Sequence, residues 1–137
     1  IYIGAAAVAD YAPAQAQPQK IKKLAQETTL VLQKTKDILA AVALLPKHPF
    51  VVGFAAETDD LEAYAKGKLL HKKLDMIAAN WVGKQQGGFE KDENSLHVFW
   101  NDGEKVLAMT DKKQLARQLL ELIAEKMNEK NTVKNPG

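Results

Sequence analysis

Unbroken apolar runs alternate with amphipathic stretches along the chain. The runs at residues 1–8 and 50–56 lack polar alternation, which is typical of parallel strands buried on both faces. A shorter run, "DMIAAN" at residues 75–80, predicts a third strand, and the alternating "TLVLQK" at residues 29–34 is a candidate for another. Apolar residues at helical spacing predict helices at residues 36–45, 58–73 and 111–127. This order predicts an α/β fold, with three layers and a Rossmann-like, mostly parallel sheet.

The remaining segments predict a hairpin and two loops. "SLHVFW", the turn "NDG" and "EKVLAM" form a hairpin pattern, which we expect to add strands at an edge of the sheet. Pro13 and Pro18 exclude regular structure from residues 9–19, and residues 82–92 form a Gly-rich polar loop.

The domain is expected to occupy residues 1–127.

Asp59 is predicted to cap the helix at residues 58–73, with Glu62 as the reciprocal partner. Residues 128–137 are polar and are predicted to form a disordered tail.

Composition narrows the class of protein. A chain of 137 residues suits one domain, and the formal charge of +2 is too small to indicate a nucleic-acid partner. No apolar run approaches the roughly 20 residues that span a bilayer, so no membrane partner is expected. The absence of cysteine excludes disulfides and thiolate metal sites, and it suits a cytoplasmic location.

Common catalytic motifs are missing. The histidines His48, His71 and His97 do not have metal-ligand spacing, and no metal site is predicted. The only serine, Ser95, opens a predicted strand, so a Ser-His-Asp arrangement has no support, and there is no P-loop.

Small residues recur where the predicted strands end. "IYIGAAAVAD" and "FVVGFAAETD" share three large apolar residues, a glycine, an Ala-Ala pair and a final Asp, and the third strand ends in "AAN". Alanine is a poor strand former, so its repetition needs a reason. Either a ligand approaches the three strand ends, which would then line one floor, or helices pack tightly on the sheet. The sequence leaves both alternatives open.

Two lysines fall inside the apolar stripe of the helix at residues 58–73. The stripe consists of Leu61, Tyr64, Ala65 and Leu69. Lys68 and Lys72 lie between Tyr64 and Ala65 on the helical wheel. Their apolar stems could lie along the protein while their ammonium groups reach water. Alternatively, both ammonium groups bind an anion such as a polyphosphate.

A second lysine cluster, "KIKK" at residues 20–23, follows a Pro- and Gln-rich loop. It is either a solvated charge run or part of a movable flap that carries Lys20 into a crevice.

Taken in order, several motifs carry a family resemblance. They are "AAVADY", "KIKK", "VVGFAAET", the helix with Lys68 and Lys72, "AN", the Gly-rich loop with "GF", and "LHVFW". In this order and spacing, residues 1–126 resemble the phosphopantothenate–cysteine ligase domain. In bacteria, that domain is usually the C-terminal part of a bifunctional flavoprotein of coenzyme A biosynthesis.

The resemblance implies a reaction. 4′-Phosphopantothenate is joined to cysteine at the expense of CTP, through an acyl-cytidylate, to give phosphopantothenoylcysteine. It also implies Mg²⁺ bound with CTP, a cytoplasmic homodimer, and FMN only in a decarboxylase domain that this chain does not contain.

Site residues follow from the same resemblance. The nucleotide-binding residues would be Ala6, Ala7, Asp10, Lys20, Asp37, Ile38, Phe54, Lys68 and Lys72. Asp10 and Phe54 would hold the cytidine, and the two helix lysines the triphosphate. Lys20 would be catalytic and would stabilise the charge that develops on the activated intermediate, from a flap crossing to the partner subunit. Where the family often has Asn-Pro-Asp-Ile, this chain has Thr35-Lys36-Asp37-Ile38.

The chain departs from the family pattern at its start. Family domains begin earlier, with a first strand, a Gly-rich turn and an asparagine that binds the acyl intermediate. We therefore expect the C-terminal portion of a ligase domain, with the N-terminal part missing, that is inactive alone. The alternative is a non-catalytic nucleotide-binding or dimerisation module.

Overall fold

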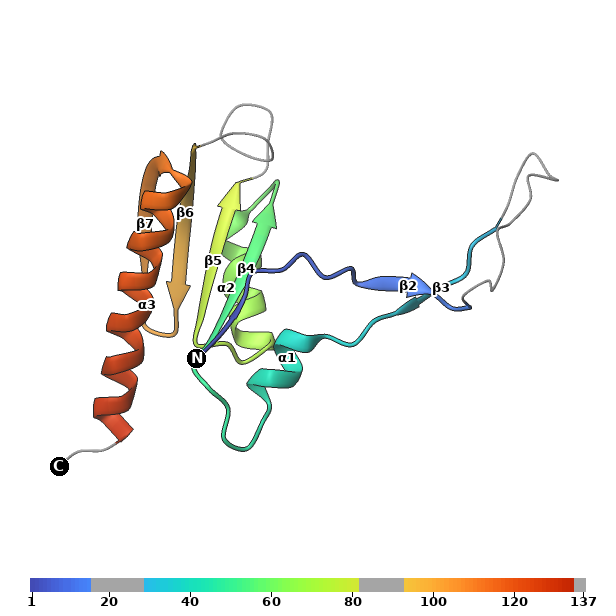
Figure 1. Ribbon diagram of the computed structural model, residues 1–137, viewed down its shortest axis with the longest axis horizontal. Helices are drawn as coiled ribbons and strands as arrows, with labels where there is room; N and C mark the ends of the chain where they lie inside the picture. The colour runs from blue at the N-terminus through green and yellow to red at the C-terminus, as the bar shows by residue number, and fades with distance from the viewer. Residues whose placement is uncertain (16–28, 82–92, 135–137) are drawn as a thin grey trace.

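The computed structural model describes residues 1–15, 29–81 and 93–134. Within these residues, five strands form one sheet (Figure 1). Their order is β1 (Tyr2–Gly4), β4 (Val51–Glu57), β5 (Met76–Trp81), β6 (Glu93–Trp100) and β7 (Gly103–Asp111). The first three are parallel, and β6 and β7 add an antiparallel hairpin at one edge. The predicted α/β class and the edge hairpin are confirmed.

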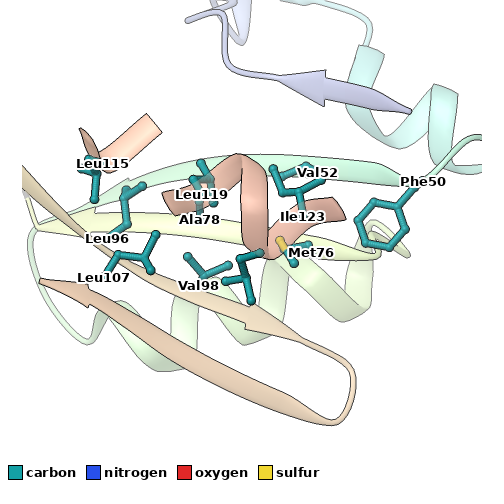
Figure 2. Close-up of a cluster of buried hydrophobic side chains, with 11 residues drawn as sticks. Phe50, Val52, Met76, Ala78, Leu96, Val98, Leu107, Leu115, Leu119 and Ile123 are labelled. Carbon is teal, nitrogen blue, oxygen red and sulfur yellow. The ribbon is translucent and has the colours of Figure 1, made fainter. Parts of the chain in front are cut away.

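Helices cover both faces of the sheet and complete three layers. α3 (Lys112–Lys134) packs on one face, and α1 (Ile38–Ala43) and α2 (Leu61–His71) pack on the other. Figure 2 shows Leu119 and Ile123 of α3 packed against Val52, Met76 and Ala78 of the sheet. Neighbouring residues of β4 and β5 enter opposite cores, which explains why their sequences are apolar without alternation.

Two short strands form a separate sheet away from the main body (Figure 1). β2 (Tyr11–Pro13) and β3 (Leu32–Lys34) pair antiparallel, and we call this pair the arm. The prediction of a strand within "TLVLQK" is confirmed, but the prediction that residues 9–19 lack regular structure is wrong at β2. A two-stranded sheet has only edge strands, where proline is tolerated because its missing N–H faces outward.

The C-terminal helix is longer than predicted. α3 continues to Lys134, so the expected tail is helical over residues 128–134. Tertiary contacts stabilise this extension: Lys130 forms an ion pair with Asp75, and Met127 packs against the core. Its polar sequence gave no sign of these partners. The last three residues, 135–137, lie outside the described part.

The predicted capping box on α2 is wrong. The N-cap is Asp60, in a left-handed conformation and without a side-chain hydrogen bond to the helix. Asp59 instead accepts a hydrogen bond from the Thr58 hydroxyl. α1 has a conventional cap, in which Asp37 accepts a hydrogen bond from the backbone N–H of Ala40 at 3.0 Å.

Candidate functional site

A cavity of about 570 Å³ opens beside β1, where this strand ends early and the chain turns toward the arm. The link between β1 and the arm forms one wall, and the link between the arm and α1 forms another. Residues of β1, β4, β5 and α1, together with the C-terminal end of α2 and the turn after it, complete the lining. The predicted first strand at residues 1–8 therefore stops at Gly4, and the residues after it line the cavity.

The cavity brings together candidate residues that are far apart in the sequence. Its lining includes Ala6, Ala7, Asp10, Asp37, Ile38, Phe54, Lys68 and Lys72. These are all of the predicted nucleotide-binding residues except Lys20. Lys20 belongs to residues 16–28, which lie outside the described part. Three chain segments and one helix thus converge on one space.

Tight packing accounts for the glycines of the repeated strand pattern. Gly4 and Gly53 are directly paired between β1 and β4. A Cβ atom at Gly4 would lie 3.0 Å from Leu39, and one at Gly53 would lie 2.9 Å from Leu39 and 2.8 Å from Leu74. Leu39 of α1 therefore packs over both glycines, which sets the inner wall of the cavity.

The alanines of the pattern divide between the two alternatives. Ala6 and Ala7 line the cavity, as a ligand crevice requires. Ala78 and Ala79 are fully buried in the two cores and do not line it. At the end of the second strand, Phe54 lines the cavity, but Ala55 is buried and neither Ala55 nor Ala56 lines it. The expectation that three strand ends form one floor is therefore wrong for the alanine pairs of the second and third strands.

Each cavity lysine has a carboxylate partner. Lys68 Nζ lies 2.6 Å from Glu57 Oε1, and Lys72 Nζ lies 2.9 Å from Asp37 Oδ2. The hydrogen bond from the Ala40 backbone, together with that from Lys72, holds the pKa of Asp37 below its usual value. Asp37 is therefore ionised at neutral pH and joins the start of α1 to the end of α2.

The position of the lysines on α2 differs from the predicted wheel. Leu61, Ala65 and Leu69 are buried, but Tyr64 is exposed, so the buried stripe is narrower than expected. Lys68 consequently lies at its margin, and Lys72 is the C-cap residue, where the packed part of the helix ends. Their side chains are 43% and 28% exposed, so both are partly covered, and both residues line the cavity.

Positive charge predominates in the lining. Four lysines (Lys34, Lys36, Lys68 and Lys72) stand against two aspartates (Asp10 and Asp37). This excess favours an anionic ligand. His71 also lines the cavity, one residue before Lys72. In the sequence, His71 showed only a lack of metal-ligand spacing, so its place in the cavity was not predicted.

Thr35 ties the two walls of the cavity together. Its hydroxyl donates to the carbonyl of Ala9 at 2.6 Å, and its backbone N–H donates to the carbonyl of Asp10 at 2.9 Å. Thr35 is one of two residues that depart from the family pattern, and it fixes the spacing between the predicted cytidine-binding segment and the start of α1.

Neither a metal-binding cluster nor a membrane-spanning helix is present among the residues that the structure describes. Across residues 1–15, 29–81 and 93–134, no three His, Asp or Glu side chains are grouped so as to hold a metal ion. Within the same ranges, no helix is long and apolar enough to cross a membrane.

Comparison with known proteins gives a consistent family. Residues 1–127 match the family model described as the DNA/pantothenate metabolism flavoprotein C-terminal domain. The chain is 50% identical over 135 residues to the coenzyme A biosynthesis bifunctional protein CoaBC of Escherichia coli K12, covering 96% of this chain and 33% of that protein. It is 42% identical over 125 residues to CoaBC of Bacillus subtilis, covering 90% and 31%. The chain thus spans about one third of the length of these relatives.

Solved structures agree with these matches. The crystal structure of the C-terminal domain of a CoaBC protein superposes with a TM-score of 0.66 at 31% identity, covering 92% of this chain and 53% of that one. The DNA/pantothenate metabolism flavoprotein from Streptococcus pneumoniae superposes with a TM-score of 0.71 at 23% identity, covering 90% and 62%, and supports the fold. These matches confirm the family resemblance carried by the motifs.

Proposed function

This chain belongs to the DNA/pantothenate metabolism flavoprotein C-terminal domain family, and from that premise we propose that it forms the nucleotide site of a CTP-dependent phosphopantothenate–cysteine ligase. The observation that carries the proposal is the cavity: eight residues that the motifs assign to nucleotide binding surround one positively charged space. The enzyme would act in coenzyme A biosynthesis, the process named for its relatives.

The reaction has two steps. A carboxylate oxygen of 4′-phosphopantothenate attacks the α-phosphorus of CTP, the bond to the β-phosphate breaks, and pyrophosphate leaves. The cysteine amine then attacks the acyl carbon of the acyl-cytidylate, CMP leaves, and the amine loses a proton to solvent. Neither step needs a nucleophilic side chain, since positioning and charge stabilisation supply most of the catalysis in such transfers.

Different cavity residues bind different parts of CTP. Lys68 and Lys72 face the triphosphate, and Asp10 and Phe54 hold the cytidine beside the backbone of Ala6 and Ala7. Asp37 and Ile38 add contacts to the nucleotide from the start of α1. Lys20 stabilises the charge that develops during activation.

Ion pairing does not remove the lysines from this role. An ammonium group has three N–H donors, so Lys68 can bind Glu57 and a phosphate oxygen together, and Lys72 can do the same with Asp37. Mg²⁺ enters with CTP as part of the substrate.

The arm supports the proposed homodimer. Tyr11, Leu30, Val31 and Leu32 expose more than half of their surface on or beside its two strands. A projecting pair of strands with apolar side chains is suited to pairing with a second copy. In a dimer built this way, residues 16–28 would carry Lys20 from one subunit toward the other's cavity. We assign FMN to a decarboxylase domain outside this chain and place the protein in the cytoplasm.

A second candidate is a nucleotide-binding or dimerisation module without chemistry. One observation favours it: the arm exposes apolar side chains, as a dimerisation surface does. CTP binding without any turnover by the unaltered full-length protein would favour the module, and the Lys20→Ala variant tests the ligase candidate. If the full-length variant binds CTP but does not turn over, the ligase proposal stands, and if turnover is unchanged, the catalytic role of Lys20 is wrong.

Pyrophosphate release by the full-length protein tests the proposed function. With 4′-phosphopantothenate and cysteine as substrates, pyrophosphate release should be much faster with CTP than with ATP. The reason is that Asp10 and Phe54 are proposed to hold the cytidine part of the nucleotide. Equal rates with both nucleotides would remove the argument for a base-reading pocket at Asp10 and Phe54.

A further inference from the structure

Glu57 stands behind one of the two cavity lysines. It is the last residue of β4, and its Oε1 accepts a hydrogen bond from Lys68 Nζ at 2.6 Å. The Glu57 side chain is only 14% exposed, whereas that of Lys68 is 43% exposed. Lys68 lines the cavity and Glu57 does not. Glu57 can therefore affect a ligand only by fixing Lys68 or through its own negative charge.

The carboxylate of Glu57 has no second structural task among the described residues. Asp37, the partner of Lys72, also caps α1 through Ala40. Glu57, by contrast, has Lys68 as its one ion-pair and side-chain hydrogen-bond partner in the described ranges. A largely buried carboxylate is costly to desolvate, and replacing such a pair by neutral groups is often harmless to stability. The position therefore calls for an explanation beyond folding.

A negative charge at this place has two effects on an anion in the cavity. It fixes the ammonium group of Lys68, which lowers the conformational entropy that binding would cost. It also repels the anion, and in a partly buried site this repulsion is only weakly screened. An isosteric neutral residue separates the effects, since an amide oxygen still accepts from Lys68 but carries no charge.

We propose that Glu57 is a positioning residue that holds Lys68 at the cavity and limits the affinity of the site for polyphosphate, so that pyrophosphate leaves after CTP is consumed. The inference rests on the proposed function and concerns its product. Pyrophosphate binds beside Lys68 and Lys72 through its negative charge alone, because it lacks the base through which CTP makes further contacts. Glu57 therefore weakens the binding of the product without touching the nucleoside.

The experiment measures pyrophosphate binding to the full-length protein by calorimetry, and pyrophosphate inhibition of turnover. Glu57→Gln should bind pyrophosphate more tightly, on the order of tenfold, because one unit of charge a few ångströms away is removed. Its inhibition constant for pyrophosphate should fall in parallel. Damage to the fold would weaken binding, so a gain in affinity is specific to the proposal.

A matched control lies on α2. Glu62 forms an ion pair of the same length, 2.6 Å, with Lys66, and neither residue lines the cavity. Glu62→Gln should leave pyrophosphate affinity unchanged. Glu57→Asp keeps the charge and should remain within about twofold of the unaltered protein. If Glu57→Gln does not fold, Glu57→Met also removes the charge at similar volume and should likewise bind pyrophosphate more tightly.

The outcomes separate this inference from the proposed function. If Lys68→Ala binds pyrophosphate and CTP as well as the unaltered protein does, the cavity is not the phosphate site and both ideas are wrong. If Lys68→Ala weakens binding but Glu57→Gln does not strengthen it, only the role of Glu57 is wrong. Tightening in Glu57→Asp equal to that in Glu57→Gln would likewise overturn it, because the charge would then be irrelevant.

Discussion

Lys72 and Asp37 join the two helices that border the cavity. The ammonium group of Lys72, at the C-cap of α2, lies 2.9 Å from Oδ2 of Asp37, at the N-cap of α1. The second oxygen of Asp37 accepts from the Ala40 backbone. One carboxylate thus caps one helix and binds the end of the other, so the shape of the cavity depends on its ionisation.

Asp37→Asn should lower the free energy of unfolding at pH 7 and lose this effect in acid. The pKa of Asp37 is depressed in the folded protein, so the carboxylate contributes stability above its unfolded pKa, and this is lost as pH falls through the folded pKa. Asp37→Ala should cost more, about 1 kcal/mol, because the cap is also removed. Urea denaturation at pH 7 and in acid, at a pH below the folded pKa of Asp37, checks both. An equal difference at the two pH values would mean that the charge of Asp37 plays no part.

Gly53→Ala should destabilise the protein by about 1–3 kcal/mol. The added methyl group would lie 2.8 Å from Leu74 and 2.9 Å from Leu39, closer than carbon atoms approach without a shift. Gly67→Ala is the matched control, since nothing lies within 4 Å of its Cβ in the middle of α2. It should stabilise by about 0.4–1 kcal/mol. Chemical denaturation measures the free energy of unfolding of both variants. A stabilised Gly53→Ala would contradict the packing of Leu39 over β4.

Lys130→Ala should cost about 1–3 kcal/mol, because it leaves the mostly buried carboxylate of Asp75 without its charged partner. Asp75 also accepts from the backbone N–H of Val51 at 2.8 Å, at the start of β4. Hydrogen exchange should show protected amides at residues 128–132 in the unaltered protein and faster exchange in the variant. Unprotected amides in both proteins would support the disordered tail that the sequence suggests.

Mixed dimers test where Lys20 acts. When Lys20→Ala subunits are combined with subunits disabled by Asp10→Ala, exchange should restore part of the activity, because each mixed dimer would contain one intact cavity supplied across the interface. Mass spectrometry of the mixture confirms that exchange has occurred. Exchange without recovered turnover would place Lys20 in the site of its own subunit.

Much of the fold could be predicted because its information is local. The unbroken apolar runs of β4 and β5 reflect burial on both faces, and each run identifies a strand without knowledge of its partners. The cavity residues were predicted from motifs, and the motifs also placed them on different segments. What brought these residues to one place was the early end of β1 after Gly4, which the apolar pattern of residues 1–8 conceals.

The remaining features depend on partners distant in the sequence. The arm forms because residues 11–13 meet residues 32–34, so Pro13 joins a strand that a local reading excludes. The end of α3 is held by Asp75, 55 residues before Lys130. Similarly, the partner of Lys72 is Asp37 on another helix. The sequence showed two lysines on one helix but not the carboxylates that hold them.

CTP binding to the full-length protein is the most direct measure of whether the cavity is a nucleotide site. Calorimetry should show that Lys68→Ala and Lys72→Ala each weaken CTP binding by on the order of 1.5–3 kcal/mol, as for lost charge-assisted hydrogen bonds. Fold stability should fall by less than about 1 kcal/mol in Lys72→Ala, because the ion pair with Asp37 is partly exposed on both sides. It should fall by about 1–3 kcal/mol in Lys68→Ala, because the largely buried carboxylate of Glu57 loses its charged partner. Lys73→Ala, on an exposed residue outside the cavity lining, should leave CTP affinity unchanged. Unchanged CTP affinity in the Lys68 and Lys72 variants, with reduced fold stability, would show that these lysines are structural and would contradict the account.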